Sequence, residues 1–154
     1  MPRSRLLQIP LALLLVLVPV SVHAQARTAT GTFDVELTPM AADSGATAIS
    51  RMAIAKQFHG DLEGTSVGQM LAKMTSVDGS AGYVAMEEVR GTLHGRTGTF
   101  ALQHNGTMNR GVPALVVSVV PDSGTGELTG IAGTMTITIT GPDHRYEFTY
   151  TIAP

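Results

Sequence analysis

Alternation of apolar and polar residues over 82–108 is the feature that most limits how this chain can fold. From 98 to 108, Phe100, Leu102, His104 and Met108 share one face with two glycines, and Thr, Ala, Gln and Asn residues fill the positions between them. A period of two is typical of a β-strand with one buried face. The segment 83–94 alternates in the same way, and a Gly-Arg-Thr-Gly sequence joins the two arms. The stretch therefore predicts a β-hairpin.

The inward faces of this hairpin carry a carboxylate and an imidazole. Glu87 belongs to the more apolar face of the first arm, and His104 to that of the second. A slip of one residue would turn a polar face toward the core, so the two apolar faces must match. A two-residue loop at Gly95-Arg96 would set Glu87 directly opposite His104, and a four-residue loop would make them diagonal neighbours. In either register the two side chains are expected side by side.

The rest of the chain reads as further strands separated by short turns. Alternation or a short apolar run indicates strands at 30–38, 49–59, 62–74, 114–120, 127–140 and 144–152. The run 114–120 is almost wholly apolar, which predicts a strand covered on both sides. Turn-forming residues separate these segments, and no segment predicts a stable helix.

About eight antiparallel strands in one domain predict an all-β fold, either a sandwich or a closed up-and-down barrel. Closure removes edge strands, which suits a chain without disulfides, and inward glycines suit sharply coiled strands. We therefore expect a closed eight-stranded antiparallel β-barrel over residues 30–152, preceded by a short polar lead at 25–29. Such a barrel has room inside for side chains or one small ligand.

The first 24 residues have the pattern of a secretory signal peptide. Arg3 and Arg5 precede the apolar run 11–20, and small residues near Ala24 fit a cleavage site. The run is too short to span a bilayer. We therefore expect an exported protein, periplasmic or extracellular, that is not held in a membrane after cleavage.

Composition excludes several classes of function. Without the signal peptide, eight basic and twelve acidic residues remain, a net charge of −4, which argues against a nucleic acid as partner. The chain has no cysteine, so thiol enzymes and zinc-thiolate sites are excluded. His59, Asp61 and Glu63 alternate along one strand, but this spacing is not specific for metal, and neither a metal nor another cofactor is expected.

Several motifs together resemble those of the DUF3224 domain family. They are FHGDLEGTSVGQML (58–71), SAGYVAMEEVRGTLHGR (80–96), FALQHNGTM (100–108), VPDSGTGELTGIAG (120–133) and HRYEFTY (144–150). The resemblance covers roughly residues 30–152. It implies an eight-stranded barrel of the allene oxide cyclase-like type, and it brings no settled activity with it.

The expected site is a group of polar side chains inside this barrel. Lys56, Tyr83, Glu87 and His104 fall on inward faces, and Ser66 is placed with them. Buried charges are costly unless they are paired, so these groups must find one another or water. They form either a structural network that fixes the register or a reactive cluster.

Three functions follow from this cluster. The first is binding of a small apolar ligand in the interior, with a binding site expected at Lys56, Phe58, Ser66, Tyr83, Phe100 and Tyr146. The second is an isomerase or cyclase. In it Glu87 orients His104 or acts as a base with a raised pKa, while Lys56 or Tyr83 stabilises developing negative charge. The third is an interaction module with a filled core. A homodimer is expected on general grounds, because small barrels often associate.

Overall fold

The computed structural model describes residues 24–41 and 49–153. The predicted signal peptide therefore lies outside the described part of the chain, apart from Ala24. Within the described ranges, no helix is both long and apolar enough to cross a membrane.

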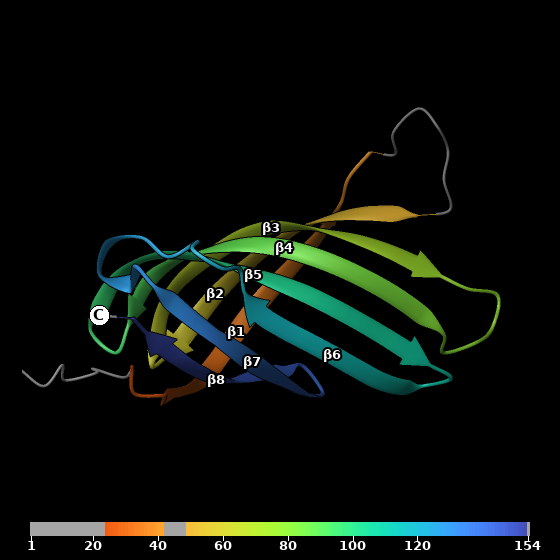
Figure 1. Cartoon of the computed structure of the whole chain (residues 1–154). Coiled ribbons are helices and arrows are strands. Elements are labelled where there is room, and N and C mark those ends of the chain that lie inside the picture. Colours follow the sequence, from red (N-terminus) through yellow and green to blue (C-terminus); the bar gives the residue numbers. More distant parts are fainter. Residues whose placement is uncertain (1–23, 42–48, 154) are drawn as a thin grey trace, which may run out of the picture.

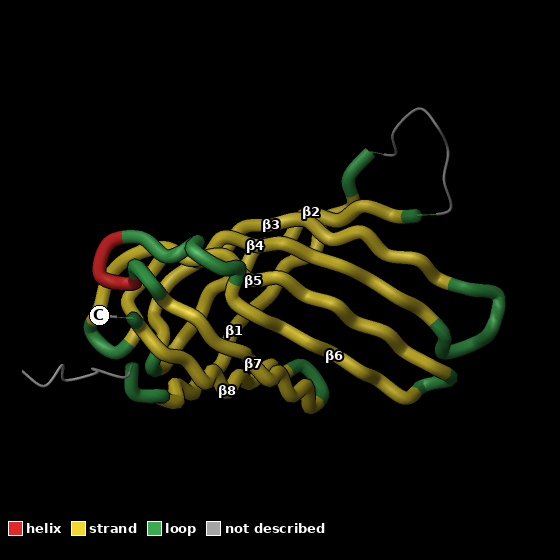
Figure 2. The backbone as a smooth tube through the Cα atoms, viewed as in Figure 1, coloured by secondary structure: helices red, strands yellow, loops and turns green. Residues whose placement is uncertain are grey.

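The chain forms a closed antiparallel barrel in which each strand pairs with the next and β8 returns to β1 (Figure 1). The strands are β1 (Arg27–Pro39), β2 (Ser50–Gly60), β3 (Leu62–Met74), β4 (Ala81–Leu93), β5 (Arg96–Asn109), β6 (Val112–Val119), β7 (Ile131–Thr140) and β8 (Asp143–Ile152). A short 3-10 helix, η1 (Gly126–Leu128), is the one helical segment among the described residues (Figure 2). The predicted all-β fold, closed barrel and strand number are confirmed.

Three local predictions differ from the structure. β1 begins at Arg27 rather than at residue 30, because Arg27 pairs with Tyr150 of β8 and extends the strand. The strand expected at 127–140 begins at Ile131, after η1. The run expected to be covered on both sides is covered on one: in β6, Val117 is buried and Val116 is 63% exposed. A single-walled barrel has no second layer, so outward positions meet solvent even when they are apolar.

One end of the barrel is packed with large side chains. Aromatic rings fill it, with Phe100 stacked on Phe148 at 5.6 Å between ring centroids and Phe148 on Tyr150 at 5.3 Å. Leu128 of η1 is fully buried there and closes that end from outside the strands. Each large apolar side chain buried in this way contributes about 1.5–3 kcal/mol.

The other end is less tightly closed. β6 and β7 share only two residue pairs, Val117 with Met135 and Ser118 with Thr134. Beyond these pairs the two strands diverge, and β3 to β6 extend past β7 and β8 (Figure 1). The barrel therefore has a packed end and a loosely joined end, and the polar cluster lies between them.

Candidate functional site

The β4–β5 turn sets the register on which the site depends. Leu93 pairs with Arg96, so the two-residue loop is His94-Gly95, one position earlier than predicted. Both residues have positive φ, 46° and 81°, as a type I′ turn requires. Gly95 adopts this conformation at little cost, and histidine is among the residues that tolerate it better. The alternative loop would have required the same of Arg96.

This register makes Glu87 and His104 diagonal neighbours. Glu87 pairs with Leu102, and His104 pairs with Ala85. The directly opposed arrangement that was expected from a two-residue loop is therefore wrong, and the diagonal alternative is correct. The two side chains still meet, with His104 Nε2 at 2.8 Å from Glu87 Oε1.

Glu87 is the centre of a buried polar network. Lys56 Nζ donates to Glu87 Oε1 at 2.7 Å, and Ser66 Oγ donates to Glu87 Oε2 at 2.7 Å. His104 Nε2 also donates to Oε1, since an ionised carboxylate only accepts. The side chain of Glu87 has no exposed surface, and that of Lys56 is 6% exposed. No fully buried side-chain nitrogen or oxygen in the described residues lacks a partner.

These donors reverse the expected pKa of Glu87. Burial is the largest single influence and raises the pKa. The hydrogen bond from His104, the charge and hydrogen bond of Lys56, and the hydrogen bond from Ser66 together outweigh it and lower the pKa to about 2. The alternative in which Glu87 acts as a base with a raised pKa is therefore contradicted. Glu87 is instead an anion at neutral pH that accepts hydrogen bonds from three neighbouring donors.

Backbone packing brings the members of this network together. Lys56 of β2 pairs with Ser66 of β3, which places both on the same side of the wall. Gly68 pairs with Glu87, and a Cβ at Gly68 would lie 2.6 Å from Glu87 Cβ. Glycine therefore allows β3 and β4 to approach closely at this point. Lys56 Nζ also lies over the Phe33 ring, 4.8 Å from its centroid, in a cation–π contact.

A pocket of about 240 Å³ opens from this network toward the loosely joined end. Its apolar lining residues are Phe33, Val35, Leu37, Ile54, Met70, Ala85, Leu115, Ile137 and Ile139. Its polar lining residues are Lys56, Tyr83, His104 and His144. At about 30 Å³ for each water molecule, the volume corresponds to about eight waters, so the pocket suits a small molecule.

Side-chain exposure changes along this pocket. Lys56 and His104 are buried, at 8% and 4% exposed, whereas Leu37 and Ile139 are 47% and 62% exposed. Lys56 and His104 therefore lie at the floor, and Leu37 and Ile139 lie at the mouth, where His144 pairs with Ile139.

Tyr83 completes the polar side of the pocket. It pairs with Gly106 of β5, and a Cβ at Gly106 would collide with the Tyr83 ring. The glycine thus makes room for the ring across the strand. Burial, followed by the negative charge of Glu87, raises the pKa of Tyr83 above its usual value. The hydroxyl stays protonated and remains a hydrogen-bond donor.

The residues predicted from sequence divide between the pocket and the packed end. Lys56, Ser66, Tyr83, Glu87 and His104 lie in or beside the network. Three residues of the expected ligand site do not line the pocket and belong to the hydrophobic core. They are Phe58, Phe100 and Tyr146.

Most of the aliphatic mouth was not assigned from sequence. Val35, Ile54, Ile137 and Ile139 lie in segments that were predicted as strands, but nothing in their alternation says which end of the barrel is packed. A signal was nevertheless present. Large aromatic residues gather on one half of β8, and smaller inward residues such as Ala85 and Gly106 lie toward the other end.

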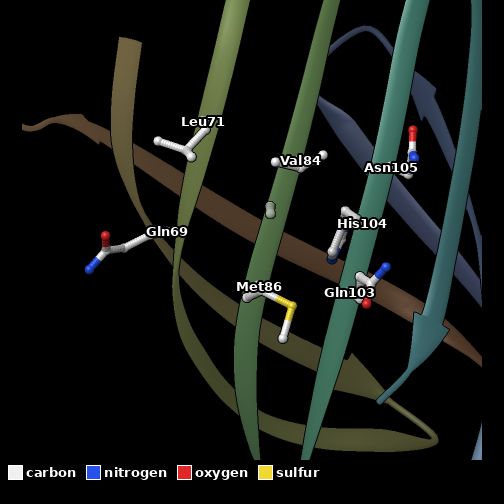
Figure 3. A pocket seen from close by; sticks show the side chains of 8 residues that line it. Gln69, Leu71, Val84, Met86, Gln103, His104 and Asn105 are labelled. Atoms are coloured by element: carbon white, nitrogen blue, oxygen red, sulfur yellow. The ribbon is translucent and has the colours of Figure 1, made fainter. Parts of the chain in front are cut away.

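A second hollow, of about 270 Å³, lies on the outer wall of β3, β4 and β5 (Figure 3). Its outward side chains are uncharged: Gln69, Leu71, Val84, Met86, Gln103 and Asn105. Ala85 and His104 line both hollows, so the strand wall separates the two. No buried charged or hydrogen-bonded group other than His104 reaches the outer hollow, which makes the inner pocket the stronger candidate.

The alternating His59, Asp61 and Glu63 are used in separate local contacts. His59 lies 3.3 Å from Asp34, Asp61 accepts from the Thr30 backbone at 2.8 Å, and Glu63 accepts from the Gly60 backbone at 2.8 Å. Within residues 24–41 and 49–153, no group of three His, Asp or Glu side chains is arranged to hold a metal ion.

Comparison with known proteins gives one family and a close structural relative. The family model described as "Protein of unknown function (DUF3224)" matches residues 29–150. A crystal structure of a protein of unknown function from this family, from Shewanella oneidensis MR-1, is similar with a TM-score of 0.78 and 50% sequence identity. The match covers 84% of this chain and 99% of that chain. No curated protein matches the chain.

Proposed function

Because the chain belongs to the DUF3224 family, whose description assigns no activity, we propose from the geometry alone that it binds a small, largely apolar molecule inside the barrel. The observation that carries this proposal is the interior pocket of about 240 Å³, with nine apolar lining residues and a polar floor. Binding sites for small molecules are concave, mostly apolar and fitted with a few polar groups that orient the ligand.

The packed end of the barrel supports a binding role over a filled-core interaction module. The aromatic core closes one half, yet Ala85 and Gly106 keep the other half from filling. Exposed Leu37 and Ile139 at the mouth also fit a ligand that covers them.

Native mass spectrometry of protein purified from its own host tests this proposal. We expect a co-purified small molecule on the wild-type protein. Substituting Ala85→Leu should remove it, because the larger side chain fills the pocket. Val84→Leu is the matched control, since Val84 precedes Ala85 on β4, lines the outer hollow and does not line the inner pocket. Circular dichroism checks that both variants are folded.

Two results would contradict the proposal. One is an adduct that survives Ala85→Leu and disappears in Val84→Leu, which would move the site to the outer wall. The other is a wild-type protein that carries no adduct and binds none of a panel of small apolar compounds.

A proton-transfer enzyme, an isomerase or cyclase, is the second candidate. It is favoured by one contact: the His104 ring lines the pocket and donates to Glu87. In this reaction Glu87 orients His104, and His104 moves the proton. Once a bound molecule is identified, its conversion by wild type and His104→Gln decides the matter. Unchanged turnover in a variant that still binds would exclude this role.

Export and dimerisation are further proposals. We propose that residues 1–24 are removed and that the mature protein is periplasmic or extracellular, with no nucleic acid as partner. The mass of the protein recovered from its host gives the new N-terminus directly. Light scattering of the same sample gives the oligomeric state, for which a dimer is expected.

A further inference from the structure

We propose that the ligand carries a carboxylate at one end and enters the pocket carboxylate first. This inference rests on the proposed binding function and adds the chemical class of the ligand. It starts from the distribution of charge: the polar residues that line the pocket are Lys56, Tyr83, His104 and His144, and none of them is acidic.

Glu87 is close to the floor but is withheld from the pocket. Oε1 accepts from Lys56 and His104, and Oε2 accepts from Ser66. Its side chain has no exposed surface, and it does not line the pocket. A molecule in the pocket therefore meets the Lys56 ammonium before it meets the carboxylate.

Lys56 has donors to spare. An ammonium has three N–H groups, and in the described residues one hydrogen bond of Lys56 is made, to Glu87. Nζ also lies over the rings of Phe33 and Phe58, with centroids at 4.8 and 5.8 Å. A ligand carboxylate would accept a hydrogen bond from another N–H group of Lys56. Such charge-assisted bonds are roughly twice as strong as neutral ones.

Tyr83 supplies a second donor on the same wall. Tyr83 lines the pocket, and the raised pKa of its hydroxyl keeps it protonated. The pocket therefore offers a carboxylate one ammonium donor and one hydroxyl donor. An ammonium ligand would instead face Lys56 with like charge.

The gradient of exposure fixes the orientation. Lys56 is 8% exposed at the floor, and Ile139 is 62% exposed at the mouth. The apolar part of the ligand would lie along Val35, Ile137 and Leu37 and cover the exposed aliphatic groups. A volume of about 240 Å³ suits a short chain or a single ring.

Three probes with the same eight-carbon chain test the head group: octanoate, 1-octanol and octylamine. Each is titrated calorimetrically into the mature protein, octanoate and octylamine below their micelle concentrations and 1-octanol below its solubility limit. We expect octanoate to bind about tenfold more tightly than 1-octanol, and octylamine to bind more weakly than both. Octanol or octylamine binding as tightly as octanoate would overturn the inference and leave the proposed function standing. If none of the three probes binds, the inference fails. The proposed function is judged separately, by native mass spectrometry of the wild-type protein and of Ala85→Leu.

Variants assign the preference to Lys56. Lys56→Met alone leaves Glu87 buried without its cation and risks unfolding, so the double variant Lys56→Met/Glu87→Gln removes both charges together. We expect its affinities for octanoate and 1-octanol to become equal. Lys73→Met is the matched control, because Lys73 is exposed on β3 and should leave the tenfold preference intact. A preference that persists in the double variant would overturn the inference.

Discussion

Glu87 shows at the scale of one residue how burial and hydrogen bonding compete. Burial alone would favour the neutral acid, but donors from three other strands hold the side chain as an anion. Alternation of residues along the hairpin was enough to predict that Glu87 and His104 are inward neighbours. The sequence could not say whether burial or the donors His104, Lys56 and Ser66 would decide the pKa of Glu87, because that balance depends on distances between strands.

The lowered pKa of Glu87 predicts a loss of stability in acid. The pKa is about 2 in the folded protein against an ordinary value of 4.5. A lowered pKa stabilises the fold above pH 4.5, and this contribution is lost as the pH falls from 4.5 toward 2. At about 1.4 kcal/mol for each pKa unit, the contribution is about 3 kcal/mol. Urea unfolding of the wild-type protein between pH 6 and pH 2.5, roughly the range of this linkage, measures it.

Glu87→Gln isolates this residue, because the amide does not titrate. We expect the variant to be less stable than wild type at neutral pH and to lose much of the acid-dependent change. Glu88→Gln is the control, since Glu88 is exposed on the same strand and should keep the wild-type pH profile. Parallel pH profiles for wild type and Glu87→Gln would contradict the assignment.

At the scale of the element, close approach of β3 and β4 depends on Gly68. The pairing of Gly68 with Glu87 leaves no room for a Cβ, which would meet the Met86 carbonyl oxygen and lie 2.7 Å from Glu87 Cα. Glycines within the predicted strands indicated bends or close approaches. Which glycine faces which neighbour became known only from the register, and that depends on the His94-Gly95 turn.

Gly68→Ala is therefore expected to lower stability. The added methyl group meets backbone atoms, which must shift, and overpacking of this kind costs about 1–3 kcal/mol. Gly82→Ala is the matched control on β4, because its Cβ would meet no atom closer than 3.8 Å. Urea midpoints of the two variants measure the difference. Equal midpoints would show that the strands can separate at Gly68 without cost.

At the scale of the whole molecule, the β6–β7 contact is the weakest join in the closed barrel. Two residue pairs join these strands, against thirteen in the β3–β4 ladder. Val116 of β6, next to these pairs, is 63% exposed, and Val112 at the start of the strand is 70% exposed. Closure and strand number could be predicted from eight strand segments joined by short turns, but the uneven length of the ladders could not.

Amide hydrogen exchange should reveal this join. We expect residues 112–116 of β6 to exchange faster than the centre of β3 and β4, since fewer interstrand hydrogen bonds protect them. Addition of a ligand that fills the pocket should slow exchange near Leu115, which lines it. Uniform protection around the barrel would show that β6 and β7 are joined more firmly than their pairing indicates.

The sequence by itself determined the strand order, the inward face of the alternating strands and the meeting of Glu87 with His104, because these follow from a period of two along the chain and from short turns. Tertiary structure decided which half of the barrel is packed and which half is open. It also decided that Glu87 is held as an anion away from the pocket while Lys56 faces it. Volume and electrostatics depend on how eight strands curve around one another, and alternation within single strands carries no information about that curvature.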